Sequence, residues 1–511
     1  MKSESRIKNV ENNLIFSMLC QIVNLLINFA SRTVFIHVLS KDYLGINSLF
    51  ANVLTIISFA ELGIGNAIVF HLYKPLAIND IPAIKSLMDF YKKAYRYIGM
   101  VVVILGLLMV PFLGFIIKDP PAIKESLTII YLLFLFDTAS SYFFTYKKSI
   151  IIADQQNYLV DVYTQIIKVF QVGLQIVLLL LTKNYMLYLF IQIVSTFICN
   201  IFVAYKADCL YPYLKEKSEK LPKAQSTAIF KDVKALVVYK LGSVVLNGTD
   251  NIIISTMLNV GTVGLVSNYH LIILACQSIL GRITNAFVAS IGNVNAVENN
   301  SRKYDIFNKV FFINSLFYGF FSVVLLLLLN DLVQIWLGAE FVLSNVVVIS
   351  VVLHFYVFGV HNAASIYRTT LGLFNEGKIA PMLAAILNII LSVALCKKIG
   401  LPGIFFATSI SRLLTMGIVD PIIVFRKIEV PVRKYYIHYL MYMAVYVAVY
   451  FITKYILSFI TIISIPMIVV KGVIATAVFG LIVLLAFGRS KMFGELLCIL
   501  KRKVGKVTLK R

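Results

Sequence analysis

The chain has 511 residues, of which 60% are hydrophobic and only 14% are charged, and its formal net charge is +23. A soluble globular protein needs a largely polar surface, so this composition excludes one and predicts a protein whose main solvent is lipid. The positive charge alone would also suit a nucleic-acid-binding protein, so the placement of the basic residues has to decide between the two.

The apolar residues come in runs long enough to cross a membrane as helices, since about 20 residues span the ~30 Å hydrocarbon core. Runs such as 323–329 and 440–452 lack the alternation that barrel strands require. We therefore predict an all-α polytopic membrane protein with about fourteen transmembrane helices. The predicted spans lie near residues 12–38, 44–72, 97–117, 126–146, 157–182, 185–205, 236–258, 263–290, 310–329, 344–367, 379–396, 401–425, 436–453 and 465–488.

The basic residues are distributed unequally between the two sides of the membrane. If the N-terminus is cytoplasmic, most Lys and Arg residues fall in cytoplasmic segments. The outside loops then hold only Lys41, Lys118, Lys124, Lys183, Lys397, Lys398 and Lys454. This asymmetry obeys the positive-inside rule and predicts a multi-pass protein of the cell membrane with both termini cytoplasmic. It accounts for the charge without nucleic acid, and a basic cytoplasmic face would attract anionic membrane lipids.

One long polar segment, 206–235, separates six predicted helices from eight. Residues on its two sides match at a constant offset of 219: Leu39, Leu44, Gly45 and Ser48 correspond to Leu258, Val263, Gly264 and Ser267. We predict two related six-helix lobes that alternate access around a central site. The predicted parts are an N-lobe (1–205), a cytoplasmic linker (206–235), a C-lobe (236–425), and helices 13 and 14 with a basic cytoplasmic tail (426–511).

The predicted outside loops are short and hold no carboxylate-rich domain, and no DxD, HExxH, GxSxG or P-loop motif occurs. We therefore expect a transporter, not an enzyme, without a cofactor or a built-in ATP motor. Transport would draw on a substrate gradient or on Na⁺ or H⁺ coupling. The six cysteines show no CxxC spacing, so we expect neither disulfides nor a metal site.

Charged side chains inside the spans are the best functional leads, because each costs about 2.5–3.5 kcal/mol on insertion scales. Arg32 follows Asn24 and Asn28 along one side of the first helix. It is a candidate cavity-lining cation for an anionic headgroup, or else a structural or interfacial charge. Asp250 lies nearly at the repeat-equivalent position, so the two could face one another as a gating ion pair, a cation or proton site, or a static pair.

Three arginines of the C-lobe, Arg282, Arg368 and Arg412, fall in the inner half or middle of their helices. Guanidinium groups suit phosphate because their planar donors bind two oxygens together. All three are candidate substrate-binding cations, although for Arg368 membrane topology is an equally good explanation. Glu61, followed by two glycines, is a candidate for coupling or gating near a hinge, and Asp137 is a further candidate for ion coupling.

Several stretches resemble the Wzx-type polysaccharide flippases of the multidrug/oligosaccharidyl-lipid/polysaccharide (MOP) exporter superfamily, in the branch found in Gram-positive capsule clusters. They are RTVFI (32–36), LGINSLF (44–50), AELGIGNAI (60–68), LYKPL (72–76), TDNIIIS (249–255), RTTLG (368–372), NII (388–390) and DP (420–421). The resemblance implies two bundles in a V shape around a central cavity. It also implies transfer of an undecaprenyl-pyrophosphate-linked oligosaccharide, a capsule repeat unit, to the outer leaflet, with a polymerase and glycosyltransferases of the pathway as partners.

Helices 13 and 14 resemble an extra pair in some of these flippases, and the resemblance implies that this pair binds the lipid tail. The alternatives within transport are a teichoic-acid or peptidoglycan-precursor flippase or a drug exporter of the same superfamily. From another class, the alternative is a membrane glycosyltransferase or polysaccharide polymerase, which the short outside loops disfavour.

Overall fold

A computed structural model describes residues 2–61, 64–117, 121, 123–154, 156–219, 221–373, 376–490 and 492–494. Every regular element within these ranges is a helix and none is a strand, which confirms the all-α prediction. Most of the predicted basic C-terminal tail lies outside the described residues.

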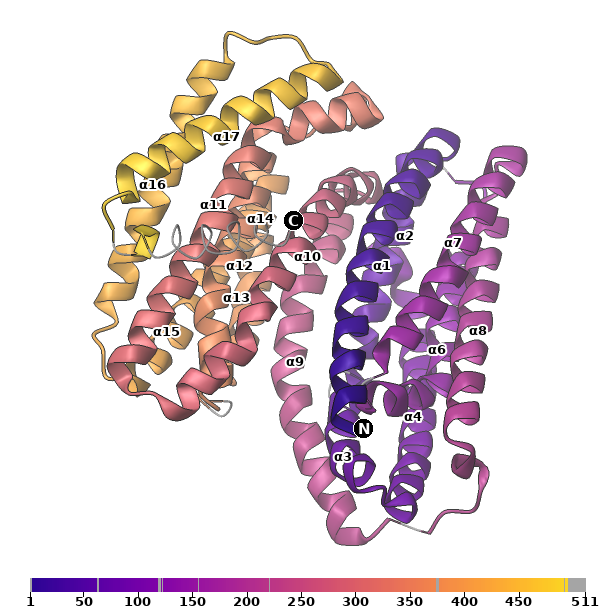
Figure 1. Ribbon diagram of the computed structural model, residues 1–511. Coiled ribbons are helices and arrows are strands. Elements are labelled where there is room, and N and C mark those ends of the chain that lie inside the picture. The colour runs from indigo at the N-terminus through magenta and orange to yellow at the C-terminus, as the bar shows by residue number, and fades with distance from the viewer. Residues whose placement is uncertain are drawn as a thin grey trace, which may run out of the picture. The chain divides into compact units, whose positions relative to one another are not determined.

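The chain forms two compact units, residues 1–267 and 268–511. The first unit holds α1 (Lys2–Val38), α2 (Lys41–Ile57), α3 (Ile64–Ile78), α4 (Ile81–Met109), α5 (Leu113–Ile116), α6 (Leu127–Ala153), α7 (Asn157–Thr182), α8 (Tyr185–Leu210), α9 (Lys223–Met257) and the start of α10 (Val260–Val297). The second holds the rest of α10 and α11 (Asn300–Leu337), α12 (Asn345–Thr370), α13 (Ala380–Ile399), α14 (Leu401–Leu414), α15 (Met416–Lys427), α16 (Arg433–Leu457) and α17 (Ile465–Phe487) (Figure 1). The predicted lobe boundary in the linker 206–235 stays a prediction.

The described residues contain eleven helices that are long and apolar enough to cross a membrane. Three further predicted spans, 12–38, 44–72 and 236–258, coincide with α1, with α2 plus α3, and with α9, which are helical as well. The protein is therefore a multi-pass membrane protein.

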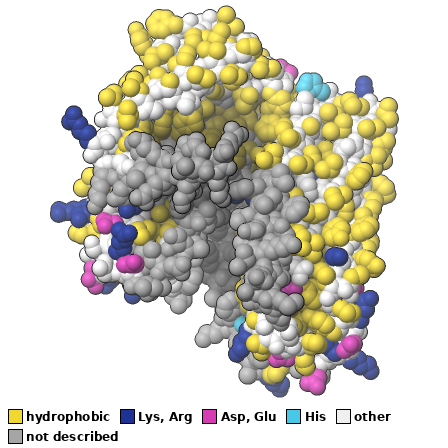
Figure 2. Space-filling model, in the orientation of Figure 1, with side chains coloured by type: hydrophobic (Ala, Val, Ile, Leu, Met, Phe, Trp, Pro, Cys, Tyr) yellow, Lys and Arg dark blue, Asp and Glu magenta, His cyan; other side chains and the backbone are white. Residues whose placement is uncertain are grey.

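The outward surface of the first unit has the character that lipid requires. On α7, Phe170 is 75% exposed and Leu181 is 76% exposed, whereas Gln175 on the opposite face is 1% exposed. Figure 2 shows hydrophobic side chains covering the flank of this unit, while Lys and Arg gather at one end of it. Polar groups facing inward and apolar groups facing outward reverse the pattern of a helix in water.

Two predicted spans are interrupted. The predicted span 44–72 is divided by a 3₁₀ turn, Ser58–Glu61, between α2 and α3, at the site where the sequence suggested a kink. The predicted span 401–425 is divided at Thr415, whose hydroxyl donates to the Ser411 carbonyl at 2.6 Å. A hydroxyl that bonds back to the preceding turn competes with regular helical hydrogen bonding.

Proline in α15 leaves a carbonyl that another helix satisfies. Pro421 has no amide hydrogen, so it cannot donate to the carbonyl of Gly417 four residues earlier. The hydroxyl of Tyr436 on α16 donates to that carbonyl at 3.2 Å. This contact fixes α16 against α15, because a buried unpaired carbonyl would be costly in a membrane.

The sequence repeat is visible as a reciprocal contact between α2 and the start of α10. A Cβ atom added to Gly45 would lie 2.0 Å from the Val260 carbonyl oxygen, and one added to Gly264 would lie 2.1 Å from the Lys41 carbonyl oxygen. Lys41 and Val260 are themselves 219 positions apart, as are the two glycines. The two helices therefore cross backbone to backbone at repeat-equivalent positions, where only glycine fits.

Candidate functional site

The second unit holds a buried cluster of charges around Asp420 on α15. Asp420 is fully buried, with Arg368 Nη1 at 3.2 Å from one carboxylate oxygen and His361 Nε2 at 3.1 Å from the other. Both groups come from α12, seven residues apart and so on the same helix face. His361 Nε2 also lies 3.0 Å from the Met416 carbonyl oxygen. Asp420 therefore neutralises the guanidinium of Arg368, which leaves that arginine less available to an external anion.

Arg412 on α14 is 4% exposed and lies over the ring of Phe358, with its guanidinium carbon 4.9 Å from the ring centroid. A cation over an aromatic face is stabilised by the ring quadrupole. Arg412 also lines a cavity of about 280 Å³ with His361, Tyr435, Tyr436 and Tyr439. The cavity is mostly apolar, and the Arg412 guanidinium could bind an anionic group that carries an apolar tail.

Arg32 belongs to the first unit, where its Nη1 donates to the Ser267 hydroxyl at 2.9 Å. Ser267 lies near the start of α10, and its sequence repeat-mate is Ser48 on α2. Arg32 therefore lies beside the crossing of Gly45 and Gly264, on the polar side of α1 that the sequence predicted. Its pairing with Asp250 stays a prediction.

Glu61 lies at the break between α2 and α3, near the hydroxyls of Tyr95 and Tyr142. These two tyrosines are buried, and their rings stack with centroids 6.4 Å apart. Phenol hydroxyls can stabilise a carboxylate, a proton or a small cation held by it. The candidate coupling residue thus lies at an irregular backbone segment that could change shape.

The other predicted residues occupy separate places. Asp137 on α6 accepts a hydrogen bond from the Gln192 amide on α8 at 3.1 Å. Asp250 on α9 is 8% exposed, and Arg282 on α10 is half-buried. Among the described residues, no group of three His, Cys, Asp or Glu side chains is placed to hold a metal ion.

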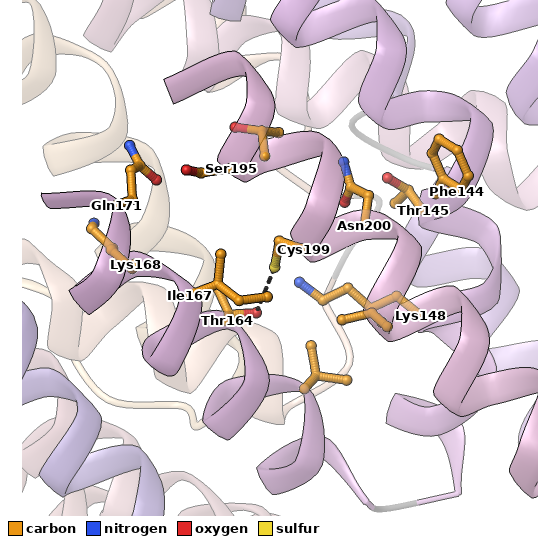
Figure 3. A pocket seen from close by; sticks show the side chains of 13 residues that line it. Phe144, Thr145, Lys148, Thr164, Ile167, Lys168, Gln171, Ser195, Cys199 and Asn200 are labelled. Carbon is orange, nitrogen blue, oxygen red and sulfur yellow. Dashed lines mark hydrogen bonds between the residues drawn. The ribbon is translucent and has the colours of Figure 1, made fainter. Parts of the chain in front are cut away.

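A pocket of about 230 Å³ with polar and apolar lining residues lies between α6, α7 and α8 of the first unit (Figure 3). Two lysines line it, Lys148 from α6 and Lys168 from α7, with Asn200 from α8. Lys148 lies just outside the predicted span 126–146 and Lys168 lies inside the predicted span 157–182, so the sequence alone did not bring the two together. The spacing of Thr164, Lys168 and Gln171, at helical intervals along one face, was the signal that could have found the pocket.

Arg368 and Arg412 therefore lie close to the same group of residues in the second unit. His361 contacts Asp420, as Arg368 does, and it also lines the cavity with Arg412. Asp420 was not among the predicted site residues, although its position within a span was the available signal. Arg32, Glu61, Asp137 and Asp250 lie in the first unit, with different neighbours.

No protein-family model matches the sequence, and a comparison with curated proteins gives no match. Solved structures are similar in fold. The lipid II flippase MurJ in an inward closed conformation aligns with a TM-score of 0.66 and 15% identity, over 92% of this chain and 97% of that one.

Two MATE transporters also align. An inward-facing multidrug resistance MATE family transporter of the MOP superfamily has a TM-score of 0.60 and 11% identity, over 82% of this chain and 98% of that one. A mutant of the Vibrio cholerae MATE transporter VcmN has a TM-score of 0.57 and 12% identity, over 83% and 98%. This chain therefore has the fold of the MOP-superfamily transporters.

Proposed function

We propose that the protein is a flippase that moves an undecaprenyl-pyrophosphate-linked oligosaccharide, a capsular repeat unit, from the inner to the outer leaflet by alternating access. The protein is a carrier and not an enzyme. Its headgroup route holds cations for the pyrophosphate, while the isoprenoid tail stays in lipid.

The extent of the structural match carries the proposal. The match to MurJ covers 92% of the chain, whereas the matches to multidrug transporters cover 82% and 83%. That difference is close to the combined length of α16 and α17, which have 25 and 23 residues. A lipid flippase therefore accounts for more of the chain than a drug exporter does.

The buried cations support an anionic substrate. Arg412 lies over an aromatic ring beside a cavity, and Arg32 donates to a neutral hydroxyl. Neither of these contacts cancels the positive charge, in contrast to the contact of Arg368 with Asp420. Bidentate donors of this kind suit a pyrophosphate.

A second candidate, a flippase for a peptidoglycan precursor, is favoured by the similarity in fold to the lipid II flippase MurJ. The two functions differ in the sugar and share the pyrophosphate lipid. The same argument applies to a teichoic-acid flippase.

Reconstitution in proteoliposomes tests the proposal. A fluorescent undecaprenyl-pyrophosphate oligosaccharide added to the inner leaflet should reach the outer leaflet with the intact protein. We expect Arg32→Ala and Arg412→Ala to reduce the rate at least tenfold, because each removes a charge-assisted contact of about 1.5–3 kcal/mol. Arg302→Ala, at the exposed start of α11, is the matched control and should leave the rate unchanged.

Normal flipping in both cavity variants would refute their role as substrate cations. A strong preference for lipid II over the capsule-type lipid would select the second candidate. Transport of a cationic drug with no lipid transfer would overturn both.

A further inference from the structure

The pocket between α6, α7 and α8 contains none of the arginines proposed for the transport route, and its lining is unusual for a helix bundle in lipid. The described lining residues include the two ammonium groups of Lys148 and Lys168 and no acidic side chain. In the part of the chain that the structure describes, neither lysine has a salt-bridge partner. Two positive charges in one pocket without a carboxylate favour an anionic occupant.

Several hydrogen-bonding side chains surround the same space. Thr145, Thr164, Gln171, Ser195 and Thr196 line it with the two lysines. The side-chain nitrogen of Asn200 is buried there and has no hydrogen-bond partner. A buried amide donor without an acceptor is costly, so its position beside two cations indicates a site for an acceptor that carries negative charge.

Figure 3 shows Lys148 extending toward the contact between Cys199 and Thr164, while Lys168 and Gln171 lie at the other side of the pocket. The Cys199 thiol lies 3.7 Å from the Thr164 hydroxyl, and both side chains line the pocket. Side chains from all three helices therefore line the pocket that contains the two ammonium groups.

The depth of the pocket points to a lipid. Lys168 lies eleven residues after Asn157, the first residue of α7, which places its Cα ~17 Å along the helix. Lys168 is therefore near the middle of this 26-residue helix, whereas Lys148 lies five residues before the end of α6, nearer the predicted cytoplasmic side. With the predicted topology, the pocket extends from that side toward the middle of the membrane. The neighbouring outward side chains are apolar: Phe170 is 75% exposed and Phe202 is 52% exposed. A phosphate that enters at this depth would carry acyl chains, which these rings accommodate.

We propose that this pocket binds the phosphate group of an inner-leaflet anionic lipid, with Lys148 and Lys168 as its cationic ligands and Asn200 as a donor. The site shares no residue with the arginines proposed for the transport route. Its phosphate could also come from solution, so the test distinguishes the two sources.

Cys199 provides a local measurement. The full-length protein, with its five other cysteines replaced by serine, is purified in dodecyl maltoside, which contains no phosphate. The rate at which a methanethiosulfonate reagent modifies Cys199 is then measured with added dioleoyl phosphatidylglycerol, with dioleoylglycerol and with inorganic phosphate. We expect phosphatidylglycerol to slow modification several-fold, and dioleoylglycerol and inorganic phosphate to have little effect.

Protection by phosphatidylglycerol should be lost in Lys148→Gln/Lys168→Gln and in Asn200→Asp, which replaces a donor with a negative charge. It should persist in Lys183→Gln, which removes a lysine at the far end of α7. Equal protection by dioleoylglycerol would show an apolar groove, and equal protection by inorganic phosphate would show a soluble anion site; either would overturn the lipid assignment. Protection of Cys199 by phosphatidylglycerol that persists in both pocket variants would also overturn the lipid assignment.

Discussion

Single charged residues in this protein differ by what surrounds them, not by how deeply they are buried. Arg368 and Arg412 are equally buried, each 4% exposed. Arg368 has the Asp420 carboxylate at 3.2 Å, whereas Arg412 has the face of Phe358 and lines a cavity. The Asp420 contact favours a structural role for Arg368, whereas the cavity beside Arg412 supports its proposed role as a ligand for an anion.

Removal of Asp420 should destabilise the second unit more than removal of both charges. Asp420→Leu leaves the Arg368 guanidinium buried without its counter-charge, which costs about 3–5 kcal/mol. Asp420→Leu/Arg368→Met removes both charges and should recover much of that loss. Thermal unfolding of the purified variants measures the difference, and strictly additive losses would contradict the coupling.

Asp250 and Glu61 are the residues through which ion coupling should act. If either carries a coupling cation or proton, lipid transfer in proteoliposomes will depend on an imposed Na⁺ or H⁺ gradient. Asp250→Asn or Glu61→Gln, which keep the side-chain shape but remove the charge, should abolish that dependence. Indifference of the unmodified protein to both gradients would remove the coupling hypothesis.

At the scale of elements, contacts between helices in this protein depend on small residues and on side chains that hydrogen-bond to unpaired backbone carbonyls. The crossing of α2 and α10 brings backbone atoms into direct contact at Gly45 and Gly264. Within α15, the Tyr436 hydroxyl donates to the Gly417 carbonyl that Pro421 leaves unpaired. Both features connect helices whose composition alone shows only apolar segments.

Gly45→Ala and Gly264→Ala should each lower the melting temperature, because the added Cβ would collide with a backbone carbonyl that cannot rotate away. Gly173→Ala on α7 is the matched control, since nothing lies within 4 Å of its added Cβ. It should be neutral or stabilising by up to about 1 kcal/mol, the difference in helix propensity. Equal losses at all three positions would show that the crossing is not the cause.

Tyr436→Phe should destabilise the protein by about 1–3 kcal/mol, the cost of an unpaired buried carbonyl. Pro421→Ala restores an amide that can donate to Gly417, so the double variant should lose less than Tyr436→Phe alone. Thermal unfolding of the three variants tests this, and an equal loss in the single and double variants would mean that the hydroxyl acts elsewhere.

At the scale of the whole molecule, the distribution of Lys and Arg predicts the orientation. Alkaline phosphatase fused at the C-terminus should be inactive, and a fluorescent protein fused there should fluoresce, because that end is predicted to be cytoplasmic. Alkaline phosphatase inserted near Gly338, between α11 and α12, should be active. An active C-terminal phosphatase would mean an odd number of spans and would invert part of the topology.

The sequence by itself determined the class of the protein. Long apolar runs can only be helices in lipid, because lipid cannot satisfy a backbone that is not hydrogen-bonded internally, and this requirement acts within each segment. The sequence also located the repeat at an offset of 219 and the irregular segment at Glu61, since glycine and charge patterns are local.

Only the tertiary structure decided which charges meet. Arg368 and Asp420 are 52 positions apart, and the pocket of Lys148 and Lys168 needs three helices at once. Partner choice depends on the rotation and height of each helix relative to its neighbours. In lipid, where apolar faces are nearly equivalent, side-chain packing over the entire bundle sets both.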